Sequence, residues 1–226
     1  MRAIRPLVLG LTIATAGFVA GAQASAQEAS APANASHTHI GHVADRFGNT
    51  PENRGLLATA RAELEVANTH VGLGLRDPSN LASMKTHAGH VLNAIDPSAE
   101  DEGPGLGYGL KRAVDGAIQH LGMAAEAPVA TQNVKTHNRL VQAAMANVQI
   151  WTNQIVPLVA EARAATEAWQ AASAMSQIQI LTGKILNGHD ADDDGEVTHK
   201  SFEGGLRQIE PLVALMKAGE GLKIDP

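Results

Sequence analysis

The sequence contains no cysteine among its 226 residues. The absence of thiols excludes disulfide bonds, thiolate zinc sites, iron–sulfur clusters and haem attached through a C-x-x-C-H motif. Aromatic residues are also scarce, with three Phe, two Trp and one Tyr. Any transition metal bound by this chain must therefore be ligated by His, carboxylate or Met side chains, and few rings are present to line a pocket for haem.

Positive charge is in short supply as well. The chain carries 17 Lys and Arg against 23 Asp and Glu, a formal net charge of −6. This balance argues against nucleic acid and anionic membranes as partners, because both attract basic proteins. The motifs H-E-x-x-H and G-x-S-x-G are missing, and so is the pair of E-x-x-H motifs that di-iron bundles carry on two helices. We therefore expect a protein that is not an enzyme and has no catalytic residues.

The only long apolar run lies near the N-terminus. Residues 1–26 have the parts of a secretory signal peptide, because Arg2 and Arg5 precede the apolar run and Ala24-Ser25-Ala26 resembles a cleavage site. We therefore predict a periplasmic or secreted protein with no membrane insertion after the signal is removed. The polar composition of the following residues, 27–49, predicts a flexible, His-containing arm.

Residues 50–226 predict a single all-α domain. Apolar residues recur at helical spacing, and no alternating strand pattern is present. Pro and Gly divide this pattern into a helical bundle of about six helices, with a helix–loop–helix at the C-terminus. Thr50-Pro51 and Asp77-Pro78 are expected to cap the first two helices. The expected helices cover residues 50–75, 77–95, 110–125, 131–169 with a kink at Pro157, 172–187, and 201 onward.

An acidic loop precedes the last expected helix. Three aspartates alternate, so that their short carboxylates can converge on one cation, and Gly195 then allows a sharp turn. The segment 190–201 resembles the calcium loop of the EF-hand family, although only one such loop is present. The resemblance implies a site for Ca²⁺. Its implied ligands are Asp190, Asp192, Asp194, Glu196 through its carbonyl oxygen, and Thr198.

The last ligand position of this loop departs from the family. Ser201 stands where the family has a bidentate Glu, and Glu203 follows two residues later. The loss of that ligand predicts weak calcium binding, in the range of about 10⁻⁴–10⁻³ M that extracellular modules show. The expected role of the ion is to hold the last two helices at a fixed angle or to sense calcium.

The ten histidines are a second supply of metal ligands. Each of the first four expected helices carries at least one, and a bundle can direct such side chains to one interior point. His137 falls within the apolar stripe of its helix and His87 at the edge of another, so we expect these two to point inward and share Cu²⁺, Zn²⁺ or Ni²⁺. The further candidate ligands are His70, His90 and His120.

Two more features concern histidine. The predicted arm contains His37, His39 and His42, and three imidazoles so close in sequence can collect Cu²⁺ or Zn²⁺ even in a flexible segment. Five of the ten histidines follow Thr, and Lys-Thr-His occurs at 85–87 and at 135–137. These recurrences raise the hypothesis that three of the helices are distant repeats of one hairpin unit.

Together these features predict an exported metal-binding protein, with calcium in the acidic loop and a transition metal at histidines. One alternative is a b-type haem protein used in electron transfer, with two His, or one His and Met84, Met123 or Met145, as axial ligands. Another alternative is a non-catalytic helical adaptor of the cell envelope, which would use the acidic loop only for stability.

Overall fold

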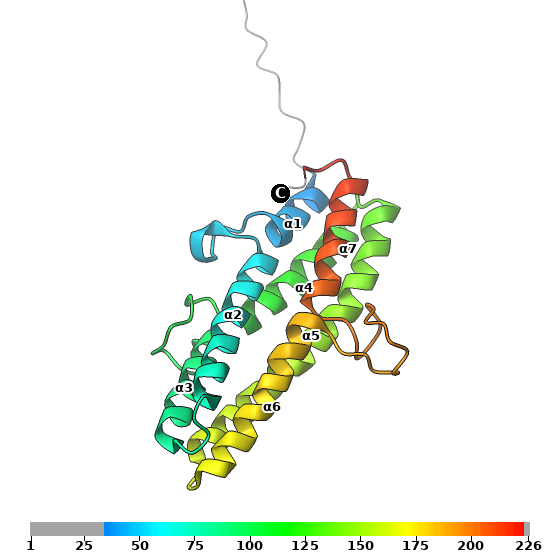
Figure 1. Ribbon diagram of the computed structural model, residues 1–226. Coiled ribbons are helices and arrows are strands. Elements are labelled where there is room, and N and C mark those ends of the chain that lie inside the picture. The colour runs from blue at the N-terminus through cyan, green and yellow to red at the C-terminus, as the bar shows by residue number, and fades with distance from the viewer. Residues whose placement is uncertain (1–33, 224–226) are drawn as a thin grey trace, which may run out of the picture. The chain divides into compact units, whose positions relative to one another are not determined.

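A computed structural model describes residues 34–223, so the predicted signal peptide, the first part of the predicted arm and residues 224–226 lie outside the described residues. The described part is an all-α bundle without strands, as predicted (Figure 1). Its elements are α1 (Ala35–Ala44), a 3₁₀ turn (Pro51–Asn53), α2 (Leu56–Leu75), α3 (Leu81–Ile95), α4 (Leu110–Glu126), α5 (Gln132–Ala164), α6 (Ala168–Asn187) and α7 (Leu206–Gly219). None of these helices combines the length and the apolar character needed to cross a bilayer.

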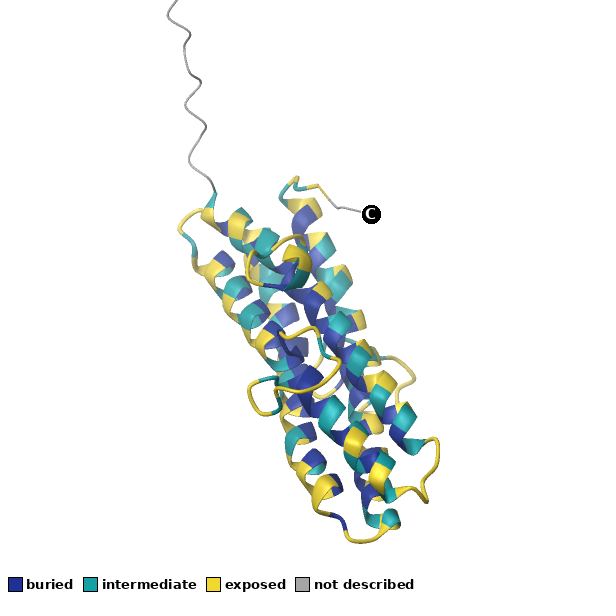
Figure 2. Ribbon diagram, turned by 90° about the vertical axis from the view of Figure 1, so that its left-hand side faces the viewer, coloured by how far each residue is buried: buried dark blue, intermediate teal, exposed yellow. Residues whose placement is uncertain are grey.

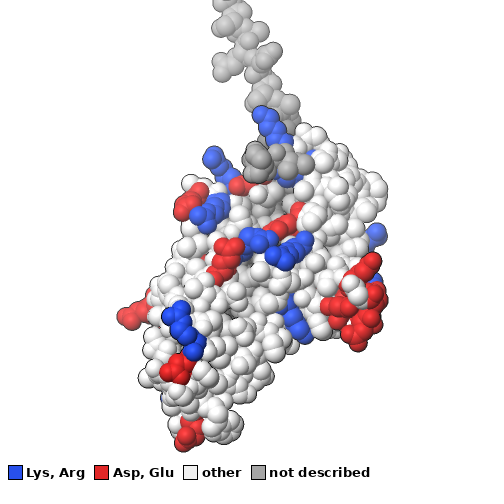
Figure 3. Space-filling model, in the orientation of Figure 1, with Lys and Arg blue, Asp and Glu red and all other residues white. Residues whose placement is uncertain are grey.

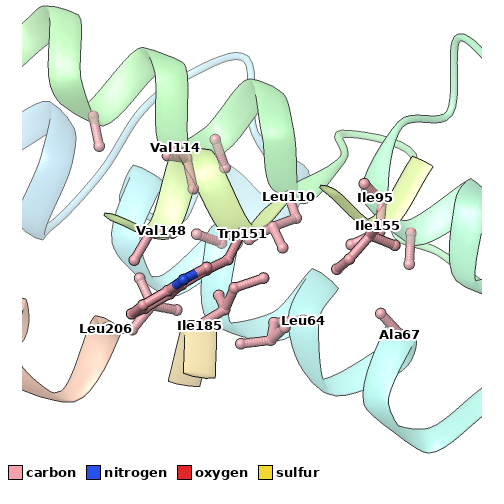
Figure 4. Close-up of a cluster of buried hydrophobic side chains, with 14 of the residues drawn as sticks. Leu64, Ala67, Ile95, Leu110, Val114, Val148, Trp151, Ile155, Ile185 and Leu206 are labelled. Carbon is pink, nitrogen blue, oxygen red and sulfur yellow. The ribbon is translucent and has the colours of Figure 1, made fainter. Parts of the chain in front are cut away.

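The core is formed by apolar stripes from all seven α-helices. Figure 2 shows the buried residues on the inward faces and the exposed residues on the outward faces. This is the arrangement that helical spacing of apolar residues predicts, because each helix buries one stripe against its neighbours. Figure 4 shows a part of the core in which α2 to α7 meet. Its labelled residues are Leu64, Ala67, Ile95, Leu110, Val114, Val148, Trp151, Ile155, Ile185 and Leu206.

Two helix starts agree with the sequence-based prediction. Helix α4 begins at Leu110, after Gly109, whose φ of 86° lies in the left-handed region that favours glycine. Helix α5 is capped by Thr131, whose side-chain oxygen accepts a hydrogen bond from the Val134 N–H at 3.2 Å. In both cases a residue next to the helix, Gly109 or Thr131, marks the start in the sequence.

The predicted helix start at Thr50 is wrong. The Thr50 hydroxyl lies 2.6 Å from the Phe47 carbonyl oxygen and 2.5 Å from that of Arg54, so it ties a turn together and does not cap a helix. Glu52 has a φ of 56°, which interrupts any helix after the short 3₁₀ turn. The predicted cap at Asp77-Pro78 is also displaced, because α3 starts after Asn80.

The first long helix instead begins after Gly55. A Cβ atom at Gly55 would lie 2.7 Å from the backbone carbon of Ala44 and 2.7 Å from the carbonyl oxygen of Val43. The end of α1 and the start of α2 therefore approach so closely that only glycine fits between them. This contact joins two different helices. Helix propensity depends only on neighbouring residues in the sequence, so it does not predict a helix start after Gly55.

The flexible arm predicted over 27–49 is wrong for residues 35–44, which form α1. Ile40 and Val43 are completely buried in the core. The Ser36 hydroxyl donates to the carbonyl oxygen of Ala124 on α4, and Lys217 of α7 forms an ion pair with Asp45. The polar composition of this segment predicts disorder, but its two buried apolar residues and these contacts hold it against the bundle.

The later helices also differ from their predicted limits. Helix α5 continues through Pro157 but ends at Ala164, short of the predicted end at 169. Helix α6 then starts after Glu167, whose N–H donates to the Gln170 side-chain oxygen at 3.0 Å in a capping box. Helix α7 begins at Leu206, five residues later than predicted, so the acidic loop is longer than an EF-hand loop.

A buried carboxylate organises the connection between α3 and α4. Glu63 of α2 is fully buried, and its two oxygens accept hydrogen bonds from the backbone N–H groups of Leu106, Tyr108 and Gly109 at 2.8–3.0 Å. A negative charge beside the first turn of α4 is favourable because the helix dipole is positive at that end. Glu63 therefore fixes the glycine-rich loop and positions α4 against α2.

Candidate metal centres

Three histidines from α2 and α3 meet in one cluster, which we call the α2–α3 centre. The Nδ1 atom of His70 on α2 lies 3.0 Å from Nδ1 of His87 and 3.2 Å from Nδ1 of His90. His87 and His90 are three residues apart on α3, so they project from the same side of that helix. All three residues are half-buried.

Three other histidines form a second cluster, the α1–α4 centre. The Nδ1 atom of His120 on α4 lies 2.9 Å from Nδ1 of His39 and 3.3 Å from Nδ1 of His42, both on α1. These residues are also half-buried. The ring of Phe47 packs against His42 and His120, with centroid distances of 5.1 Å and 5.0 Å. The α1–α4 centre therefore has an aromatic wall.

The two centres have the same design. In each, a pair of histidines three residues apart on one helix meets a single histidine on a facing helix. The paired segments are nearly identical in sequence, with Thr-His-Ile-Gly-His-Val at 38–43 and Thr-His-Ala-Gly-His-Val at 86–91. The single histidines stand in His-Leu-Gly at 120–122 and in His-Val-Gly at 70–72. In both pairs the residue directly after each histidine is buried: Ile40 and Val43 on α1, and Ala88 and Val91 on α3. Because these neighbours face the core, the two imidazoles of each pair are oriented in the same way at the two centres.

The nitrogen separations fit a small metal ion. A tetrahedral zinc ion with Zn–N bonds of about 2.0–2.1 Å holds its nitrogen ligands about 3.3 Å apart. The Nδ1 separations of 2.9–3.3 Å between the single histidine and each member of the pair are close to that value in both centres. Within each centre, one ligand nitrogen from every residue lies within 4.8 Å of the others. Only small side-chain adjustments are therefore needed to coordinate an ion.

The protonation state of the histidines also suits metal binding. Burial is the main reason why the pKa lies below its ordinary value of 6.5 in four of the six residues, and the neighbouring imidazoles lower the pKa further. These four are His39, His70, His87 and His120. A lowered pKa keeps the imidazole neutral near pH 7, which is the form that ligates a metal.

His137 does not join either centre. Its Nδ1 lies 3.0 Å from the carbonyl oxygen of Asn133, one turn earlier on α5, so it bonds to its own helix. The expected pairing of His87 with His137 is therefore not found, and His87 meets His70 and His90 instead. Sequence reasoning placed His39 and His42 in a flexible arm and missed their contact with His120, although the repeated six-residue segment was a visible signal.

The acidic loop brings Asp190, Asp192 and Asp194 together at the surface. Figure 3 shows acidic side chains gathered over the loop that Figure 1 draws between α6 and α7. A lysine already balances part of this charge, because Lys200 Nζ lies 3.2 Å from Asp192 Oδ2 and 3.4 Å from Asp194 Oδ2. The N–H of Gly195, whose φ is 88°, donates to Asp190 at 2.9 Å.

The remaining predicted calcium ligands take part in hydrogen bonds within the loop. The carboxylate of Glu203 is buried and accepts hydrogen bonds from the Thr198 hydroxyl at 2.6 Å and the Thr198 N–H at 3.0 Å. These bonds lower the pKa of Glu203. Glu196 is exposed, and its N–H donates to Asp194 at 2.8 Å. Glu203 therefore closes the end of the loop onto Thr198, and Lys200 lies between Glu203 and the carboxylates of Asp192 and Asp194.

Comparison with known proteins does not assign this chain to a family. No family model, no curated protein and no solved structure matches it.

Proposed function

We propose that the protein binds two divalent transition-metal ions, Zn²⁺ or Cu²⁺, one in each three-histidine centre. The observation that carries this proposal is the duplication. Six of the ten histidines form two clusters of the same composition, the same i,i+3 spacing and similar Nδ1 separations. A histidine that has only a structural role has no need of two further imidazoles at 3 Å, and imidazole suits zinc, copper and nickel.

The geometry favours a metal ion without a porphyrin over haem. Axial ligands of haem lie on opposite sides of the iron, which separates their nitrogens by about 4 Å on one line with the porphyrin between them. In each centre the Nδ1 atom of the single histidine lies 2.9–3.3 Å from the Nδ1 atoms of the pair, which suits adjacent positions on one ion. Of the three methionines considered as haem ligands, Met84 and Met145 are fully buried in the apolar core.

Calcium in the acidic loop is a separate proposal. The clustering of three aspartates supports it, as does the positive φ of Gly195. The position of Lys200 on two of the three carboxylates opposes it, because a calcium ion would have to displace that ammonium group. We therefore assign the transition-metal centres the main role and expect calcium binding to be weak.

Isothermal titration calorimetry with Zn²⁺ and Cu²⁺, together with elemental analysis, measures the number of metal ions bound per chain and tests the proposed function. We expect two equivalents per wild-type chain, one in His70→Ala, one in His120→Ala and none in the double variant. His137→Ala is the matched control, because this half-buried histidine lies outside both centres and should leave the stoichiometry at two. Wild-type protein that binds neither metal saturably would rule out the proposal.

Export to the periplasm or the exterior remains part of the proposal and depends on residues 1–26 alone. The sequence of this segment has the features of a signal peptide. N-terminal sequencing of the protein purified from its source should find a chain that starts near Gln27. A chain that retains Met1 and is recovered with cytosolic proteins would contradict export without affecting the metal centres.

A further inference from the structure

Each centre brings together three histidines of the described part of the chain. Among the described residues, no fourth His, Asp or Glu joins either cluster. Zinc bound by three histidines normally keeps an additional position for water or an external ligand, whereas closed structural sites have four protein ligands. The three histidines of each centre are half-buried, so a bound ion would lie near the protein surface.

The second nitrogen of each ring has no hydrogen-bond partner among the described residues. The Nδ1 atoms point into the centres, and within the described part of the chain no Nε2 atom of these six histidines forms a hydrogen bond with protein. No buried side-chain nitrogen or oxygen in that part lacks a partner, so these Nε2 atoms must be accessible to water. Metal-bound histidines usually donate their other N–H to a carboxylate or a carbonyl, and loss of that support weakens metal binding about 10–100-fold.

From these two features we infer that the centres hold metal as exchangeable cargo and release it by associative ligand exchange. This inference rests on the proposed function. An incoming N, O or S donor, on a small chelator or on the metal site of another protein, binds the position that the protein leaves open. The histidines then leave one at a time, so that the ion is never free in solution. A site with four protein ligands, whose histidines are also hydrogen-bonded to the protein, has no open position for an incoming donor. Such a site would release its ion only after a bond between the metal and a protein ligand had broken.

The two centres should exchange their metal ions at different rates. Phe47 packs against two of the three rings of the α1–α4 centre. In the described residues, the only rings in contact with the histidines of the α2–α3 centre are those of the centre itself. An aromatic wall limits the directions from which a donor can approach. Exchange should therefore be slower at the α1–α4 centre, and Phe47→Ala should accelerate it there alone.

Transfer of Zn²⁺ to a chromophoric chelator measures this directly. His120→Ala retains the α2–α3 centre and His70→Ala retains the α1–α4 centre. Each variant is first loaded and its single equivalent confirmed by titration, then mixed with increasing chelator in a stopped-flow instrument. We expect the transfer rate to rise in proportion to chelator concentration in both. The slope of transfer rate against chelator concentration should be steeper in the double variant Phe47→Ala/His70→Ala than in His70→Ala. The same slope should be equal in Phe47→Ala/His120→Ala and His120→Ala.

The outcomes separate the two proposals. If the variants bind no zinc, the proposed function fails before exchange is measured. If they bind one equivalent but release it at a rate that does not depend on chelator concentration, the metal-binding function stands and associative exchange is wrong. Circular dichroism of each variant confirms that the helices remain, so that a change of rate cannot be attributed to unfolding.

Discussion

The Nδ1 atom of His39 on α1 lies 2.9 Å from Nδ1 of His120 on α4, although 81 residues separate them in the chain. In the other centre, only 17 residues separate His70 from His87. A metal ion in the α1–α4 centre therefore closes a much longer loop, and the entropy of loop closure grows with the logarithm of loop length. The two centres should affect the fold differently: one ties the first described helix to the bundle, and the other reinforces a helical hairpin.

Zinc should protect the connection after α1 from proteolysis only when the α1–α4 centre is intact. Arg46 and Arg54 offer trypsin sites in this segment, and local opening of α1 exposes them. Limited digestion followed by mass spectrometry should show slower cleavage with zinc in His70→Ala and no change with zinc in His120→Ala. Equal protection in both variants would show that α1 is not held by the metal.

The metal-free protein should lose stability as the pH falls. The pKa values of His39, His70, His87 and His120 lie below 6.5 in the folded chain because burial disfavours their charged forms. Below about pH 6.5 the unfolded chain therefore binds more protons than the folded chain, and the free energy of unfolding declines with decreasing pH.

Urea denaturation between about pH 7.5 and about pH 5.5 tests this dependence. The double variant His70→Gln/His120→Gln removes one half-buried imidazole from each centre and should make stability depend less steeply on pH over this range. A slope that is the same in wild type and variant would mean that groups outside the centres cause the loss.

Replacement of Lys200 should strengthen calcium binding. The Lys200 ammonium group lies within 3.4 Å of carboxylate oxygens of Asp192 and Asp194, where it competes with a cation for the same ligands. We expect calorimetry to show tighter binding of Ca²⁺ to Lys200→Met than to wild type. Lys135→Met, which removes an exposed lysine on α5, is the matched control. If neither variant binds Ca²⁺, the loop is only an acidic turn.

Glu63→Gln should destabilise the fold. A glutamine has one acceptor oxygen in place of two, and its NH₂ group would face a backbone N–H from the loop before α4. Loss of hydrogen bonds to a buried charged group costs about 1.5–3 kcal/mol. Chemical denaturation measures the free energy of unfolding, with the exposed Glu65→Gln on the same helix as the control. A cost equal to that of the control would mean that the loop has other support.

The sequence by itself determined the fold class and several helix limits. Apolar residues at helical spacing specify helices with one buried stripe, and the absence of alternating patterns excludes a sheet. Helix α5 could be located because Thr131 caps it with its own side chain. The acidic loop was visible for the same reason, since its three aspartates are neighbours in the chain. Each of these features is set by residues within a few positions of one another.

Only the tertiary structure decided which histidines meet. The helical period orients His137 with respect to its own helix, yet its Nδ1 bonds to the carbonyl oxygen of Asn133. The polar sequence around His39 predicts a flexible arm, yet burial of Ile40 places His39 against His120 on a helix far away in sequence. The spacing of apolar residues along one helix does not predict which other helix packs against that helix. The pairing of helices depends on how all the apolar stripes pack together.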